Sequence, residues 1–182
     1  MNSNNKVARI IAIIVAVLVA GAVANYDKWL PHRWQTYTAP DGTFSIELPG
    51  QPSVEATQAP LDGGGTATMT LVSVQTTRTT AYMCTYVEND NFGNKTPDEI
   101  LEAARDGSLK KIQGTAISQS HLTIQGYPAL DVQAQARENS VTDSRMILAG
   151  KRMYMIVAVA GAQERELKTV QRVFDSFKII NP

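Results

Sequence analysis

The sequence has little of what most enzymes and cofactor proteins use. Its 182 residues include one cysteine and two histidines, and 17 Lys and Arg residues balance 17 Asp and Glu residues. The single cysteine, Cys84, excludes an internal disulfide bond. A formal net charge of zero gives no long-range attraction for nucleic acid, and no basic run is interleaved with aromatic residues. We therefore expect no nucleic-acid partner.

Catalytic and metal-binding motifs are also missing. His32 lies beside an apolar N-terminal segment, and His121 lies in a polar stretch without a Gly-x-Ser-x-Gly nucleophile motif. The oxygen-rich stretch 88–94 departs from the calcium-loop pattern, because Phe92 takes a ligand position. The methionines after Met1 fall within apolar strands, which is typical of core residues. The sequence predicts no enzyme, no metal site and no cofactor.

Residues 1–31 form a hydrophobic N-terminal segment. An uninterrupted apolar run extends from Ile10 to Ala24, and Lys6 and Arg9 precede it. A positively charged start followed by an apolar stretch is typical of an exported chain, with the positive residues on the cytoplasmic side. The segment therefore predicts that the rest of the chain lies outside the cytoplasm.

Two interpretations of this segment stay open. Ala22-Val23-Ala24 fits a signal-peptide cleavage site. Counted from Val7 to Leu30, a helix would instead be long enough to cross a hydrocarbon core of ~30 Å. The retained helix predicts a single-pass protein of the inner membrane with a cytoplasmic N-terminus. Both interpretations make residues 32–182 one extracytoplasmic, periplasmic domain.

Two sets of residues, one aromatic and one small, are the candidate contact residues of such an anchor. Four aromatic residues surround its junction with the domain: Tyr26, Trp29, Trp34 and Tyr37. They are expected either to lie at the membrane interface or to fill a groove of a partner protein. Three small residues recur at every fourth position: Ala12, Ala16 and Ala20. This spacing permits close packing against another membrane helix.

The domain alternates strand-like and helix-like patterns. Strands are predicted at 33–38, 43–48, 66–77, 79–88, 116–124, 128–137, 143–150 and 153–160, and helices from 97 to about 113 and over 164–174. Thr96-Pro97-Asp98-Glu99 is a capping box for the first helix. The stretch 153–160 contains only apolar and aromatic residues and predicts a central strand buried on both faces. The proline-rich stretch 49–60 is interpreted as an extended connection.

This order of elements predicts an α+β fold. Hairpin-length connections favour a central antiparallel sheet of about six to eight strands, flanked by two helices. One N-terminal transmembrane helix is expected to precede it.

Several short motifs occur in a familiar order. They are PDGTFSIELP at 40–49, AARDG at 103–107, LTIQGYPA at 122–129, GKRMY at 150–154 and FDSFKI at 174–179. Over residues 34–180 the chain resembles the PsbP-like family, which includes the extrinsic lumenal subunit of photosystem II and bacterial exported proteins. The resemblance implies an antiparallel sheet flanked by helices and docking on larger assemblies rather than catalysis. It implies no catalytic residues.

These observations predict a non-catalytic, membrane-anchored accessory or scaffold subunit. Its outer domain would dock on a larger membrane protein complex, photosynthetic or respiratory, and its partners would be integral membrane subunits and the lipid bilayer. The alternative is a periplasmic module that binds a small molecule or lipid in a cavity between sheet and helix.

Overall fold

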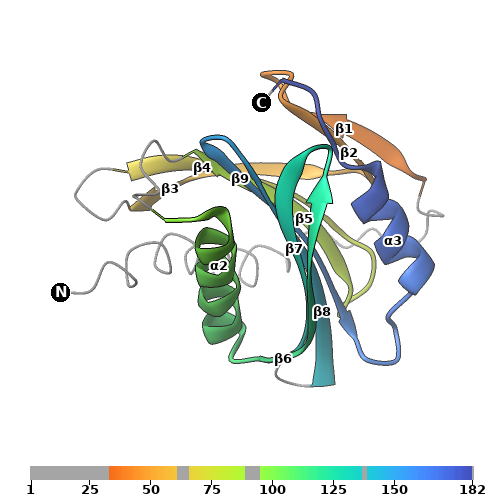
Figure 1. Ribbon diagram of the computed structural model, residues 1–182. Coiled ribbons are helices and arrows are strands. Elements are labelled where there is room, and N and C mark those ends of the chain that lie inside the picture. Colours follow the sequence, from red (N-terminus) through yellow and green to blue (C-terminus); the bar gives the residue numbers. More distant parts are fainter. Residues whose placement is uncertain (1–32, 61–65, 89–94, 137–138, 182) are drawn as a thin grey trace.

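Two antiparallel sheets and two helices make up the part of the chain that the computed structural model describes (Figure 1). That part covers residues 33–60, 66–88, 95–136 and 139–181. The predicted membrane segment lies outside the described residues, and so do Tyr26, Trp29 and the alanines at 12, 16 and 20. Among the described helices, none has the length and apolar character needed to span a bilayer.

The larger sheet has seven strands in the order β3-β4-β5-β9-β8-β7-β6. Their bounds are β3 (Ser53–Pro60), β4 (Thr66–Gln75), β5 (Ala81–Glu88), β6 (Thr115–Ile124), β7 (Tyr127–Gln135), β8 (Ser140–Ala149) and β9 (Arg152–Gly161). All neighbouring strands are antiparallel. The apolar strand β9 stands at the centre of the sheet, and most of its side chains are buried. The predicted sheet type, strand number and central strand are confirmed.

The smaller sheet joins the two ends of the domain. It contains β1 (Gln35–Thr38), β2 (Phe44–Leu48) and β10 (Lys178–Ile179) in the order β1-β2-β10. The predicted hairpin forms, with Tyr37 opposite Ile46. Its turn places Gly42 at a φ of 69°, a left-handed conformation that glycine adopts without a Cβ clash.

The two helices are α2 (Pro97–Ile112) and α3 (Leu167–Ser176). The predicted capping box at the start of α2 is confirmed. The backbone N–H of Thr96 donates to Glu99 Oε2 at 2.7 Å, and the backbone N–H of Glu99 donates to Thr96 Oγ1 at 3.3 Å. These two bonds satisfy amide groups that a helix start leaves without a partner.

The second helix begins later than the sequence indicates. The prediction began it at residue 164, but Glu164 lies before α3. Its carboxylate accepts hydrogen bonds from the hydroxyls of Thr77, Thr79 and Thr80 at 2.8, 2.6 and 3.1 Å. These side chains come from the turn between β4 and β5, so a long-range contact sets the position of Glu164.

The interpretation of 49–60 as a connection is wrong for most of its length. Residues Ser53–Pro60 form β3, which among the described strands pairs with β4 alone and is therefore an edge strand. Proline cannot donate to a strand ladder and is tolerated at strand ends and on edges. Here Pro52 precedes the strand and Pro60 ends it. The prolines therefore mark an edge position rather than the absence of a strand.

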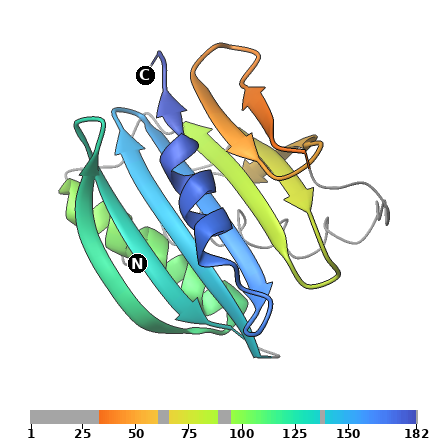
Figure 2. The same ribbon diagram turned by 90° about the vertical axis from the view of Figure 1, so that its right-hand side faces the viewer.

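The elements stack in three layers, with the seven-stranded sheet in the middle (Figures 1 and 2). Helix α2 covers one face and builds what we call the α2 core, which includes Leu101, Leu130 and Met155. Helix α3 and the small sheet cover the other face and build the α3 core, which includes Phe44 and Tyr154. Each of these five side chains is at most 2% exposed.

Candidate functional site

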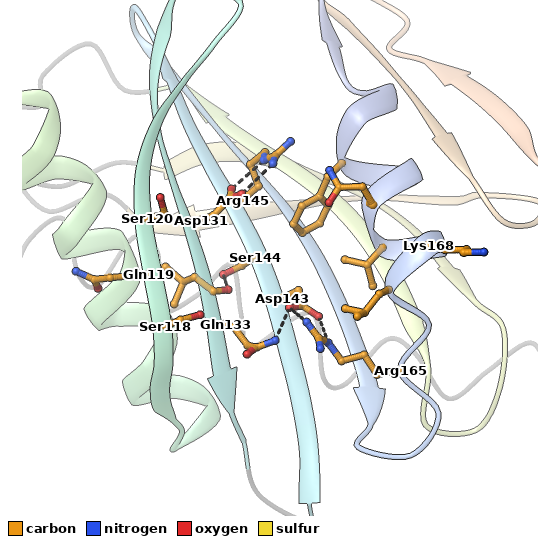
Figure 3. A pocket seen from close by; sticks show the side chains of 15 residues that line it. Ser118, Gln119, Ser120, Asp131, Gln133, Asp143, Ser144, Arg145, Arg165 and Lys168 are labelled. Atoms are coloured by element: carbon orange, nitrogen blue, oxygen red, sulfur yellow. Dashed lines mark hydrogen bonds and ion pairs between the residues drawn. The ribbon is translucent and has the colours of Figure 1, made fainter.

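An open groove of about 610 Å³ follows the side of α3 above strands β6, β7 and β8 (Figure 3). Its lining residues come from α3, from Arg165 just before it and from β6, β7 and β8, the strands that lie between α3 and the β6 edge of the sheet in Figure 2. Strand side chains form its floor and helix side chains form its wall. The groove is the candidate functional site of the described domain.

The register of the three strands places polar side chains in two rows across the floor. The first row consists of Ser118, Gln133 and Asp143, and the second consists of Ser120, Asp131 and Arg145. Side chains alternate between the two faces of a strand, so residues two apart share the groove face. Each row is therefore a set of direct cross-strand neighbours, at the distance where polar side chains can pair.

Arg145 anchors the second row. Its Nε and Nη2 atoms donate to the two carboxylate oxygens of Asp131, each at 2.8 Å. Its guanidinium carbon lies 5.0 Å from the centre of the Phe174 ring, and its side chain is 9% exposed. The hydrogen bonds to Asp131 raise the pKa of Arg145. This geometry fixes the guanidinium group in place between the sheet and α3.

Arg165 anchors the first row. It precedes α3, and its Nε and Nη2 atoms donate to the two oxygens of Asp143 at 2.7 and 2.6 Å. Gln133 donates to the same carboxylate at 3.2 Å. The hydrogen bonds to Asp143 raise the pKa of Arg165. The pair ties the start of α3 to β8 and closes one end of the groove floor.

The wall of the groove ends in an exposed rim on α3. Leu167 is 60% exposed, and Lys168 and Gln171 beside it are also exposed. The groove is therefore an open surface rather than an enclosed apolar cavity. Its rim carries an exposed leucine among polar side chains, and its floor carries paired charges. Such a surface is suited to contact with another macromolecule.

His121 lies on the opposite face of β6, beside α2. Its Nδ1 atom lies 3.3 Å from Asp98 Oδ1, and its Nε2 atom lies 3.7 Å from Glu102 Oε1. The two carboxylates flank the imidazole ring on different sides and do not converge on one point. Within the described ranges, no group of His, Cys, Asp and Glu side chains is arranged to hold a metal ion.

The structure places two of the predicted contact residues, Trp34 and Tyr37, against the α3 core, each on a partner of its own. The Arg172 guanidinium carbon lies 3.9 Å from the centre of the Trp34 ring. The Tyr37 ring packs at 5.8 Å from the ring of Phe44. Both aromatic side chains are half-buried against the α3 core, and they lie at or beside β1, away from the groove.

The sequence reasoning missed the groove. Its signal was the period-two alternation of Asp131 and Gln133 in one strand, and of Asp143 and Arg145 in the next. That alternation indicates a polar sheet face. The opposition of the two strands and the crossing of α3 beside them depend on register and packing.

Comparison with solved structures supports the fold. The chain is similar to the solution structure of cyanobacterial PsbP (CyanoP) from Synechocystis sp. PCC 6803, with a TM-score of 0.58 and 9% identity. The similarity covers 86% of this chain and 98% of that one. A Pseudomonas aeruginosa protein of unknown function has a TM-score of 0.39 and 10% identity, over 72% of this chain and 85% of its own.

The sequence comparisons add nothing to this result. No protein-family model matches the chain, and no curated protein matches it either. The domain nevertheless has the PsbP-like fold that the short motifs indicated, so the resemblance is confirmed at the level of the fold.

Proposed function

We propose that this chain is a non-catalytic accessory subunit whose outer domain docks on a larger membrane protein complex. The observation that carries the proposal is the open groove with its floor of paired arginines and aspartates. The similarity to cyanobacterial PsbP over 86% of the chain supports it, because the PsbP-like resemblance implies docking on assemblies. A photosynthetic complex is the preferred host, and a respiratory complex is the other candidate.

The groove supplies the features of a docking surface. Both floor arginines already have carboxylate partners, so they provide a rigid, nearly neutral platform rather than a free cationic site. The exposed Leu167 supplies apolar area at the rim, and Lys168 and Gln171 supply polar contacts around it. An exposed apolar side chain beside polar and already paired charged groups is a combination that protein interfaces use.

The proposal includes an N-terminal membrane anchor. Residues 1–31 would form a single-pass helix in the inner membrane with a cytoplasmic N-terminus, and residues 32–182 would lie in the periplasm. The apolar run Ile10–Ala24 supports this arrangement. Tyr26 and Trp29 would lie at the membrane interface, and the alanines at 12, 16 and 20 would face a partner helix.

A mild pull-down of the full chain from native membranes tests the docking role. The wild-type chain is expected to retain a set of integral membrane subunits. Lys168→Glu reverses a charge on the groove rim and should weaken that retention. Lys178→Glu makes the same change on the exposed face of β10, away from the groove, and should retain the partners. Migration of the wild-type chain as a free protein would contradict the proposal.

The mass of the extracted chain tests the anchor in the same sample. An uncleaved N-terminus in the membrane fraction is expected. A mature chain that begins after Ala24, recovered from the periplasm, would contradict the anchor but would leave the groove test unaffected.

A periplasmic ligand-binding module is the second candidate, because the groove volume falls in the range of small-molecule pockets, about 300–1,000 Å³. Native mass spectrometry of the extracted chain distinguishes the two candidates. A co-purified small molecule or lipid that Leu167→Asp displaces would favour the module over the docking subunit.

A further inference from the structure

The outer edge of the seven-stranded sheet, at β6, borders the groove through Ser118 and Ser120, but the backbone groups along this edge are a separate surface. β6 is ten residues long and pairs only with β7 among the described strands. Residues 115–121 are all exposed, including Ile117 at 55%. A strand at the edge of a sheet presents a row of unpaired backbone N–H and C=O groups, and another strand can pair with them.

The two edges of the sheet differ in how they are protected. Natural edge strands resist further pairing through charged side chains, prolines, bulges or short length. β3 carries Glu55 and ends at Pro60, and Pro52 precedes it. β6 contains no proline, lysine, arginine, aspartate or glutamate. Its one irregularity is a bulge at Ile117, and Ser118 to Ile124 stay in unbroken register with β7.

We infer that β6 pairs with β6 of a second copy of this chain, antiparallel across a two-fold axis. The pairing would join two seven-stranded sheets into one continuous sheet. Because β3 is protected, the joined sheet would have no further open edge of the β6 type, so the assembly closes at two copies.

The charge distribution of α2 favours a second copy over an unrelated strand. Near its start, α2 places Asp98 and Glu102 beside His121. Further along the helix, Arg105 donates to Gln119 at 2.7 Å. Because later helix residues meet earlier strand residues, α2 runs antiparallel to β6. The first turn of α2 carries Asp98 and Glu99, and its last turn carries Lys110 and Lys111.

A two-fold axis through the β6 pair would place both α2 helices on the same face and antiparallel to each other. The acidic start of each helix would then lie towards the basic end of the other. This arrangement is self-complementary, and the zero net charge of the chain adds no long-range repulsion between copies.

Pairing at β6 would also bring the two grooves onto one face. Ser118 and Ser120 of the edge strand line the groove, so each groove opens towards the junction. The dimer would present both grooves to one host. This inference does not depend on the proposed host, because it concerns contacts between copies of the chain itself.

Cysteine cross-linking of the full chain in mild detergent tests the pairing. Cys84 is fully buried, and burial raises the pKa of its thiol, so it is inert in the folded chain. Ser118→Cys and Ser120→Cys, treated with a short bis-maleimide, should give a covalent dimer. Ala56→Cys on the exposed β3 edge is the matched control and should give no covalent dimer.

Edge-blocking variants test the same pairing without cross-linking. Ser118→Lys/Thr123→Lys places two lysines on exposed positions of β6. The dissociation constant of the dimer, measured by sedimentation velocity, should rise about tenfold or more. Val54→Lys/Ala56→Lys adds the same charge to β3 and should leave the dimer unchanged.

Three outcomes would overturn the inference. The wild-type chain could sediment as a monomer. A dimer could persist in Ser118→Lys/Thr123→Lys, which would assign it to another surface such as the N-terminal segment. In native membranes the β6 cysteines could cross-link to a different protein and to no second copy, which would assign the edge to a partner strand. None of these results depends on retention of the host in the groove test.

Discussion

At the scale of single residues, Arg145 is the side chain on which the groove depends most. It is nearly buried and bonds both oxygens of Asp131, which is itself about one-third exposed. Removal of one partner leaves the other charge partly desolvated. The pair therefore fixes the groove floor only while both partners are present.

Arg145→Met is expected to lower the free energy of unfolding by about 1–3 kcal/mol, the usual loss for a hydrogen-bonded charge in a partly buried site. Asp131→Leu/Arg145→Met should lose less than the single variant, because no unpaired charge remains. Urea unfolding followed by circular dichroism measures both. Lys178→Met, at an exposed position, is the control. Equal losses in the single and double variants would contradict the assigned role of the pair.

At the scale of elements, the first helix is fixed by a local signal. Thr96 and Glu99 exchange hydrogen bonds as their sequence spacing predicts. Thr96→Ala is expected to lower the free energy of unfolding by about 1 kcal/mol. Thr123→Ala, an exposed threonine in β6, should have little effect and serves as the control in the same urea titration.

The capping box also predicts that part of the free energy of unfolding depends on pH. Hydrogen bonds from Thr96 lower the pKa of Glu99, so the carboxylate binds its proton less readily in the folded chain than in the unfolded chain. The stability that the ionised Glu99 contributes is fully present above the ordinary pKa of glutamate. It is lost as the pH falls through the lowered pKa of Glu99 in the folded chain. Thr96→Ala keeps the backbone N–H bond to Glu99 and removes the hydroxyl bond, so the part of the stability difference between wild type and this variant that comes from the hydroxyl bond should be lost in acid. A difference independent of pH would contradict this account.

Elements that depend on distant partners were predicted less well. The sequence placed Glu164 in the second helix, although three threonine hydroxyls from another turn bind it before the helix begins. β3 was missed because its prolines indicated a connection, and only pairing with β4 makes it a strand. Local patterns predict an element well when its hydrogen bonds are local.

At the scale of the whole molecule, the seven-stranded sheet contributes side chains to both hydrophobic cores. β9 contributes Met155 to the α2 core and Tyr154 to the α3 core, so loss of either core exposes the same strand. We therefore expect the domain to unfold as one cooperative unit.

Leu101→Ala in the α2 core and Ile46→Ala in the α3 core should each lower the free energy of unfolding by about 2–5 kcal/mol. Both should shift the same single transition when unfolding is followed by fluorescence and by circular dichroism. A variant that splits the transition in two would show that the layers unfold independently.

The sequence by itself determined the α+β class, the antiparallel sheet, the capped helix and the central place of β9. These features depend on periodicity, on turn residues and on a capping spacing, all of which act over a few neighbouring positions. Its scarcity of cysteine and its charge balance excluded a disulfide and gave no electrostatic attraction for nucleic acid.

Only the tertiary structure decided where the groove and the open edge lie. Asp131 faces Arg145 because of strand register, and Arg165 reaches Asp143 because α3 crosses beside β8. β6 is an edge because it stands beside β7 at the end of the spatial order of strands among the described residues, not because of its composition. Such positions depend on contacts between residues far apart in the chain, and local patterns carry no information about those contacts.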